Sequence, residues 1–177
     1  TSLLGDNPLT IRADRLVMDN QVRIISSTAL GEGGGITFTG NILELTNTST
    51  FLSQTFGDGQ AGPIRVNARE RVLVSDDPGK ALSPSGLFTN SFGDFGFGSR
   101  GKGGDIEVTT KVLDMQGGAR FNATTNSGGN GGNVTINAQS VSISGEFPTE
   151  PPSEFLGLGS TRASGIYTRT VGSDFCG

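Results

Sequence analysis

Apolar and polar residues alternate along this chain in short runs, and the runs recur at a fixed interval. The clearest stretch is 103–145, GGDIEVTTKVLDMQGGARFNATTNSGGNGGNVTINAQSVSISG, in which one complete period of 28 residues covers 105–132 and the next begins at Asn133. Alternation with a period of two indicates β-strands, and self-similarity at an interval of 20 to 50 residues is typical of a solenoid. The sequence therefore predicts an all-β fold in which each period is one coil.

Glycine-rich closures divide the chain into five such coils of about 28 residues, at 8–34, 35–62, 63–104, 105–132 and 133–170. Each coil contains three alternating segments, so we expect a single-stranded parallel β-helix with three strands per coil. The third and fifth coils are longer because loops are inserted at 76–84 and 146–162, between the second strand and the third. Insertions in solenoids gather on one face, which is often the binding face.

Corresponding apolar residues of successive coils should stack about 4.8 Å apart, the spacing of neighbouring strands in a sheet. Three ladders result. They comprise Ile11, Phe38, Val66, Val108 and Ile136; Met18, Leu45, Val74, Met115 and Ile143; and Ile24, Phe51, Leu87, Phe121 and Ile166.

The third strand of each coil also carries two other columns. Small residues, expected to point inward at a tight corner or as a hydroxyl ladder, are Ser26, Ser53, Thr89, Ala123 and Thr168; their outward neighbours, mostly large and apolar, are Ile25, Leu52, Phe88, Asn122 and Tyr167. An apolar stripe on a solvated face usually marks a contact. Cover by a segment of the same chain and cover by a partner or a neighbouring rod both remain open, and we predict an interaction surface at Ile25, Leu52, Phe88 and Tyr167.

The composition of the chain argues against several classes of function. The chain has 177 residues, 29 of them glycine, no histidine or tryptophan, and a net charge of −4, with a pI near 4.8. Nucleic acid is not the expected partner because phosphate binding needs a basic stripe. A triad with an imidazole base cannot be assembled. We interpret Asp76 and Asp77, before Pro78, as turn residues and not as a catalytic dyad.

No catalytic, cofactor or metal site is therefore predicted, although weak calcium binding at a glycine turn stays open. The glycine closures are expected to be turns that need a positive φ, not phosphate loops. Cys176 cannot form an internal disulfide, which leaves an inert terminal thiol or intermolecular pairing. The chain shows no signal peptide and starts at Thr1, so we expect a piece of a longer protein.

The stretch 85–145, beginning SGLFTNSFGDFGFGSRGKGGDIEVTT, closely resembles the repeats of cyanobacterial filamentous-haemagglutinin-like exoproteins, in motif order as well as composition. The resemblance covers 9–170. It implies a right-handed parallel β-helix, export by two-partner secretion through an outer-membrane transporter, and an extracellular or cell-surface filament with adhesive duties. The family's N-terminal secretion domain, with its NPNGI-type motif, is not found, since Asn7–Pro8 is only a turn.

The expected function is thus a structural or adhesive rod without catalysis, which associates with itself or with neighbouring coils of one long chain. A non-catalytic glycan-binding β-helix is the alternative. A polysaccharide lyase or hydrolase is disfavoured because the outward positions of the first strands hold a single carboxylate, Glu107.

Overall fold

The fold consists of parallel strands arranged in two sheets. The structure is a computed structural model, and it describes residues 7–28, 31–56, 58–77, 80–92, 101–147 and 163–170. These residues contain no helix. Their strands are β1 (Leu9–Arg12), β2 (Arg15–Asp19), β3 (Arg23–Thr28), β4 (Ile36–Thr46), β5 (Thr50–Thr55), β6 (Ile64–Ser75), β7 (Gly86–Phe92), β8 (Ile106–Gln116), β9 (Arg120–Asn126), β10 (Val134–Ser144) and β11 (Gly165–Thr170).

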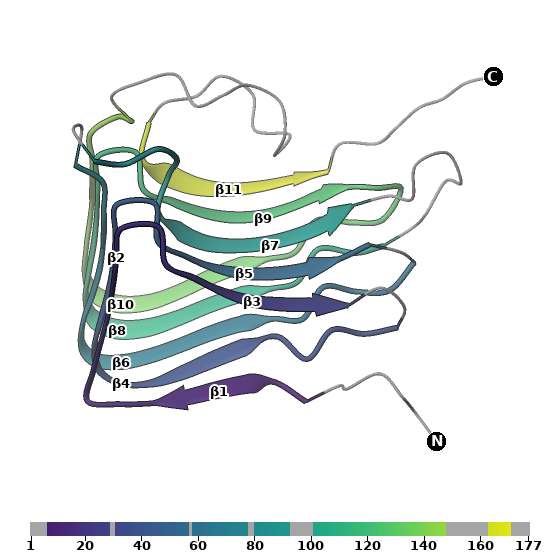
Figure 1. The fold of residues 1–177 in the computed structure, drawn as a ribbon, viewed down its shortest axis with the longest axis horizontal. Helices are drawn as coiled ribbons and strands as arrows, with labels where there is room; N and C mark the ends of the chain where they lie inside the picture. Colours follow the sequence, from purple (N-terminus) through teal and green to yellow (C-terminus); the bar gives the residue numbers. More distant parts are fainter. Residues whose placement is uncertain are drawn as a thin grey trace.

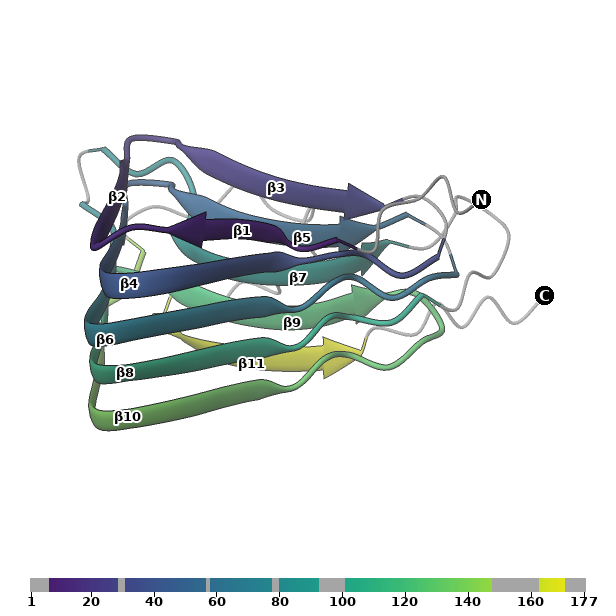
Figure 2. The ribbon, with the colours of Figure 1, turned by 90° about the horizontal axis from the view of Figure 1, so that it is seen from below.

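The order of strands in space follows the coils. One sheet has the order β1-β4-β6-β8-β10, with β2 beside β4, and the other has the order β11-β9-β7-β5-β3. Figure 1 shows each strand lying beside the equivalent strand of the next coil, and Figure 2 shows the two sheets facing one another. Ile136 pairs with Val108, 28 positions earlier, in parallel register. This arrangement is consistent with the predicted β-helix.

The first two strands of a coil are one continuous, sharply bent strand in β4, β6, β8 and β10, where separate strands were expected. Only the first coil divides them, into β1 and β2, which pair with the two halves of β4. At the bend, the register between β4 and β6 shifts between Gly40 and Ile42. The backbone amides of Asn41 and Ile42 both donate to the carbonyl of Asp14, at 2.8 and 2.9 Å. A bulge of this kind lets a strand bend without leaving the sheet.

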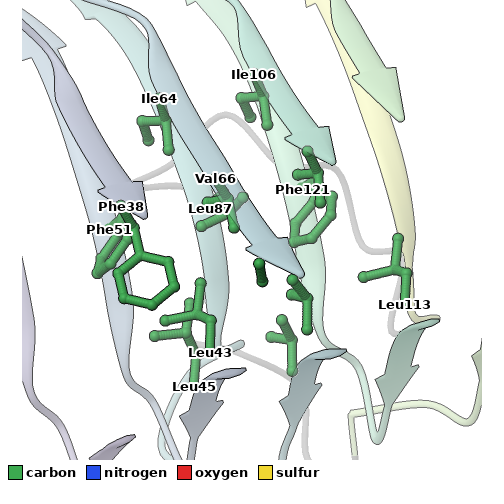
Figure 3. Packing of buried hydrophobic residues seen from close by; sticks show 14 of the residues in the cluster. Phe38, Leu43, Leu45, Phe51, Ile64, Val66, Leu87, Ile106, Leu113 and Phe121 are labelled. Carbon is green, nitrogen blue, oxygen red and sulfur yellow. The ribbon is translucent and has the colours of Figure 1, made fainter. Parts of the chain in front are cut away.

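All three predicted ladders are confirmed. The register pairs each ladder residue with its counterpart in the next coil along the whole series, as in Phe38 with Val66 and Phe51 with Leu87. The ladder residues of the middle coils are buried and form one continuous cluster, whose close packing between the sheets is visible in Figure 3. Burial of these side chains is the main favourable term for the fold.

The small inward residues of the third strands lie where the sequence places them, but their hydroxyls form only part of a ladder. Ser53 and Thr89 are both buried. Thr89 donates to the carbonyl of Gly104 at 2.5 Å, whereas the hydroxyl of Ser53 has no hydrogen-bond partner among the described residues. Further along, Thr125 donates to the carbonyl of Gly101 at 3.1 Å. The inward side is therefore apolar at the start of each third strand and polar at its end.

Glycine is required at the closures for the predicted reason and for a second one. Positive φ occurs there at Gly31 (86°) and Gly35 (79°). At Gly62 an added Cβ would lie 2.2 Å from the backbone nitrogen of Gly35, and at Gly104 it would lie 2.4 Å from the carbonyl oxygen of Gly62. Successive closures thus lie backbone against backbone, with no space for a side chain.

The corner between the second and third strands is built from pairs of residues with positive φ. They are Asn20 and Gln21 in the first coil (62° and 69°), Asn47 and Thr48 in the second (51° and 73°), and Gly117 and Gly118 in the fourth (65° and 97°). In the third coil the predicted loop occupies this place, between the end of β6 and the start of β7.

The predicted loop at 146–162 lies mostly outside the described residues, as do Cys176 and residues 93–100. Of that loop, Glu146 forms an antiparallel bridge with Ala163, and Phe147 is fully buried. The described ends of this loop therefore start and finish side by side at the same corner.

Candidate functional site

The predicted interaction surface lies on the outer face of the sheet formed by β3, β5, β7, β9 and β11. Register pairs Ile25 with Leu52, Leu52 with Phe88, Phe88 with Asn122, and Asn122 with Tyr167. The structure therefore brings the four predicted residues together in one column with Asn122, because equivalent positions of successive coils share a face.

This column is not a continuous exposed stripe, and cover by the chain itself, one of the two alternatives left open above, applies to part of it. Ile25 is 48% exposed, but Phe88 is only 5% exposed and Asn122 is fully buried. Leu52 and Tyr167 are half-buried. Both faces of β7 and β9 are buried, so at Phe88 and Asn122 the column is covered by the chain itself. Among the described residues of the column, exposure is confined to the first two coils and to the last.

At the C-terminal end of the column, the buried side chain of Arg120 contacts the aromatic ring of Tyr167. The guanidinium of Arg120 lies over the ring of Tyr167, 5.7 Å from its centroid, and the Tyr167 hydroxyl donates to the carbonyl of Ala163 at 3.0 Å. Burial lowers the pKa of Arg120, and the charges of Tyr167 and Asp76 oppose that shift. Arg120 thus fixes Tyr167 in place through a cation–π contact in a largely desolvated setting.

Asp76 joins the corner loop to two coils. Its carboxylate accepts hydrogen bonds from the Ser85 hydroxyl (2.6 Å) and amide (2.8 Å) and from the Thr48 amide of the preceding coil (3.2 Å). Burial raises the pKa of Asp76, while the hydrogen bonds from Ser85 and Thr48 and the charge of Arg120 act in the opposite direction. Asp76 is therefore an acceptor at the centre of a buried polar network.

Asp77 does not share this setting. Its side chain is exposed, and its carboxylate lies 3.6 Å from the ammonium of Lys80. A dyad needs two carboxylates in one environment, whereas one of these is buried among amide donors and the other faces solvent. The two residues act as parts of the loop, as the interpretation of 76–77 as a turn predicts, although Asp76 also binds across to the neighbouring coil.

Sequence reasoning missed an aromatic pair at the end of this face. The rings of Phe56 and Phe92 stack with centroids 5.6 Å apart and an interplanar angle of 18°. Phe56 is exposed and Phe92 is half-buried. Each lies four positions beyond a residue of the predicted column, Leu52 or Phe88, so the alternation extended by two more steps would have identified them. We call Ile25, Leu52, Phe56 and Phe92 the lateral patch.

The hollows on the described surface are small. One of about 220 Å³ is lined by polar residues that include Glu32, Arg65 and Asp105, but Asp105 already accepts a 2.8 Å hydrogen bond from the amide of Asn133. A second, of about 260 Å³, lies beside Arg69 and Lys111. Within the described ranges no three His, Cys, Asp or Glu residues group together as metal ligands would.

No described segment forms a helix long and apolar enough to span a membrane. Comparisons of the chain with protein-family models, with curated proteins and with solved structures found no match.

Proposed function

We propose that this chain is a segment of a secreted, extracellular rod, a right-handed parallel β-helix of five coils that attaches cells or matrix and packs into fibres. The observation that carries the proposal is the unbroken register of three apolar ladders over the whole series of coils. A stack of equivalent coils can be lengthened by adding further coils. Such a stack suits a protein that forms a long structural surface, and not one that binds a ligand in a single pocket.

The surface chemistry supports a structural role. Ion pairs connect neighbouring coils on the outer face of the first sheet: Arg15 with Glu44 at 2.8 Å, Arg65 with Glu107 at 3.1 Å, and Arg71 with Asp114 at 3.0 Å. Exposed pairs contribute little to stability individually. Placed on successive coils, however, they oppose a slip of register, because a shifted strand would separate each pair.

The lateral patch is the surface we assign to attachment and fibre packing. It combines the exposed Ile25 with the stacked rings of Phe56 and Phe92. Apolar groups left in water on one side of a rod favour association with a second apolar surface. Phe88 supports the patch from a buried position and is not itself part of the contact.

The test is Ile25→Asp combined with Phe56→Asp. The matched control, Thr39→Asp combined with Thr109→Asp, adds the same charge at exposed positions of the other sheet. In electron micrographs and surface-retention assays, the patch variant should lose side-by-side bundling and attachment while the control keeps both. Both variants should retain the far-ultraviolet circular dichroism of β-sheet. Unchanged bundling and retention in the patch variant would refute the proposal.

Binding of glycans without catalysis is the second candidate, favoured by the exposed ring of Phe56 beside the amide of Gln54, which donates to Ser27 at 3.0 Å. Aromatic rings and amides together can contact the apolar and the polar faces of a sugar. A glycan array probed with the wild type and with Phe56→Ala separates the candidates. Loss of a specific signal on substitution supports glycan binding, and no signal from the wild type rejects it.

A further inference from the structure

A hollow of about 260 Å³, which we call the bend hollow, lies on the outer face of the first sheet where β4, β6 and β8 bend (Figure 1). Pockets that enclose drug-sized ligands measure about 300 to 1,000 Å³, so this one has room for a group of the size of a single sugar ring. Ala68 and Thr110 are buried, and the other five lining residues are exposed. Those five are Thr39, Asn67, Arg69, Thr109 and Lys111.

A β-bulge places two basic side chains side by side in this hollow. Between Ala68 and Arg71, the two residues Arg69 and Glu70 of β6 oppose the single residue Lys111 of β8. Bulges re-aim side chains and are over-represented next to active sites. Here Arg69 lines the bend hollow together with Lys111, whereas Glu70 does not.

Neither Arg69 nor Lys111 forms an ion pair with any residue that the structure describes, Glu70 included. Other basic residues of the same face do have a carboxylate partner on the neighbouring coil, as Arg71 has in Asp114 at 3.0 Å. Like charges on neighbouring strands repel one another. An anion bound between Arg69 and Lys111 would therefore remove a repulsion that the chain itself leaves in place.

A row of neutral polar side chains crosses the same hollow. Thr39 pairs in register with Asn67, and Asn67 with Thr109, so the three lie about 4.8 Å apart from coil to coil. All three are exposed, and their side chains make no hydrogen bond to another described residue. Hydroxyl and amide groups both donate and accept hydrogen bonds. This row can therefore bind a ligand that carries several hydroxyl groups.

We propose that the bend hollow binds a carboxylate-bearing sugar ring of an acidic polysaccharide. Arg69 and Lys111 hold the carboxylate, because the planar guanidinium matches its two oxygens and the ammonium adds a second charge. Thr39, Asn67 and Thr109 bind the ring hydroxyls. The net charge of the chain is −4, so a polyanion is repelled by the rest of the surface and its binding is confined to this hollow.

This site is separate from the lateral patch. It lies on the first sheet, whereas Ile25, Leu52, Phe56 and Phe92 belong to the other sheet or follow its strands. It adds the binding of an acidic polymer to a rod whose attachment and packing are assigned to the lateral patch. The two proposals therefore use different residues and different measurements.

The first test is affinity electrophoresis in native gels that contain polygalacturonate, which should retard the wild type. Arg69→Gln with Lys111→Gln should weaken binding at least about tenfold, the equivalent of one charge-assisted hydrogen bond. The control, Arg23→Gln with Lys102→Gln, removes the same charge at exposed positions outside the hollow and should bind as the wild type does. A wild type that is not retarded, or equal weakening in both variants, would overturn the proposal.

The second test varies the polymer. Dextran, which is neutral, should not retard the wild type, and dextran sulfate should retard it less than polygalacturonate does. Equal retardation by dextran would contradict recognition of an anion, and stronger retardation by dextran sulfate would contradict the assignment to a carboxylate.

The third test separates the bend hollow from the lateral patch. Thr39→Asp with Thr109→Asp, the variant expected to keep bundling and surface retention, places two carboxylates in the hollow and should lose polygalacturonate binding. If this variant bound polygalacturonate as the wild type does, the bend hollow would be refuted and the lateral patch would be unaffected.

Discussion

The hydroxyl of Ser85 donates a 2.6 Å hydrogen bond to the carboxylate of Asp76, and this contact closes the loop between β6 and β7. The same hydroxyl accepts a hydrogen bond from the amide of Ser49 in the preceding coil, at 3.1 Å. The insertion is thus anchored where it starts and where it ends, and the stack continues past it without a change of register.

Loss of the hydrogen bond between Ser85 and Asp76 should lower the stability of the fold. Ser85→Ala removes one hydrogen bond to Asp76 and leaves the buried amide of Ser49 without its acceptor, so we expect the free energy of unfolding to fall by about 1 to 3 kcal/mol. Urea unfolding followed by circular dichroism measures the change. The control Asp77→Ala removes an exposed ion pair with Lys80 and should cost less than about 1 kcal/mol. Equal losses would show that the buried network adds nothing.

The titration of Asp76 should make stability depend on pH. Burial raises its folded pKa above the ordinary value of 3.8, so between the two values the folded state binds more protons than the unfolded state. The contribution of Asp76 to the free energy of unfolding therefore falls as pH rises through that window. Compared with Asp76→Asn, the wild type should lose relative stability as pH increases from about 4. A relative gain would contradict the assignment.

Asp19 should behave in the opposite sense. Hydrogen bonds from the Thr46 hydroxyl and then from the Asn47 amide, both 2.7 Å, lower its pKa. Its contribution is present above the unfolded pKa of about 4 and is lost as pH falls through the folded value. Thr46→Val removes the larger cause, so the variant should lose less stability than the wild type on acidification. Unfolding series at matched pH values detect the difference, and parallel curves would refute it.

The glycine closures allow a paired substitution. Gly104→Ala would place a Cβ 2.4 Å from the carbonyl oxygen of Gly62, and backbone cannot move aside easily, so we expect a loss of about 3 kcal/mol or more. Gly31→Ala meets nothing within 4 Å, although its φ of 86° is strained for alanine, and should cost about 1 to 2 kcal/mol. Thermal melts should rank the two in this order. The reverse order would mean that conformation, and not contact between coils, selects glycine here.

The position of an apolar residue along its ladder should determine how much the free energy of unfolding falls when the side chain is truncated to alanine. Met115→Ala leaves a cavity in the closed core and should cost about 2 to 5 kcal/mol. Ile143→Ala removes a side chain of similar size from the same ladder, but one side of it faces solvent, so a loss under about 1.5 kcal/mol is expected for the monomer. Denaturant unfolding at low protein concentration compares them. Similar costs would indicate that the last coil is covered in solution.

The ladders could be predicted because they depend on local alternation and on an interval of constant length. Ile136 falls on Val108 once the period is known, whatever else surrounds them. That the first and second strands merge into one could not be predicted in the same way. It depends on whether hydrogen bonding continues through the bend near Gly40, and the alternation of apolar and polar residues gives no information on that.

The candidate site was predicted in position and not in exposure. A period of two separates the faces of a strand, and Phe88 does lie outward beside Leu52. Whether an outward residue meets solvent depends on what other segments cover the sheet, and the pattern within β7 contains no information on that. Likewise, Asp76 was recognisable as a turn residue, but its bond to Thr48 joins residues 28 positions apart and has no local signature.

The parallel pairing also determines how the stack would respond to pulling. The backbone hydrogen bonds between neighbouring coils point along the stacking direction. Tension between the first and the last coil therefore breaks the hydrogen bonds of one inter-coil interface after another, and not all of them at once. Each 28-residue winding that peels away would release up to about 90 to 100 Å of extended chain. A tether built this way would yield in steps under load, longer where a coil carries an inserted loop, and would absorb work at each step before it parted.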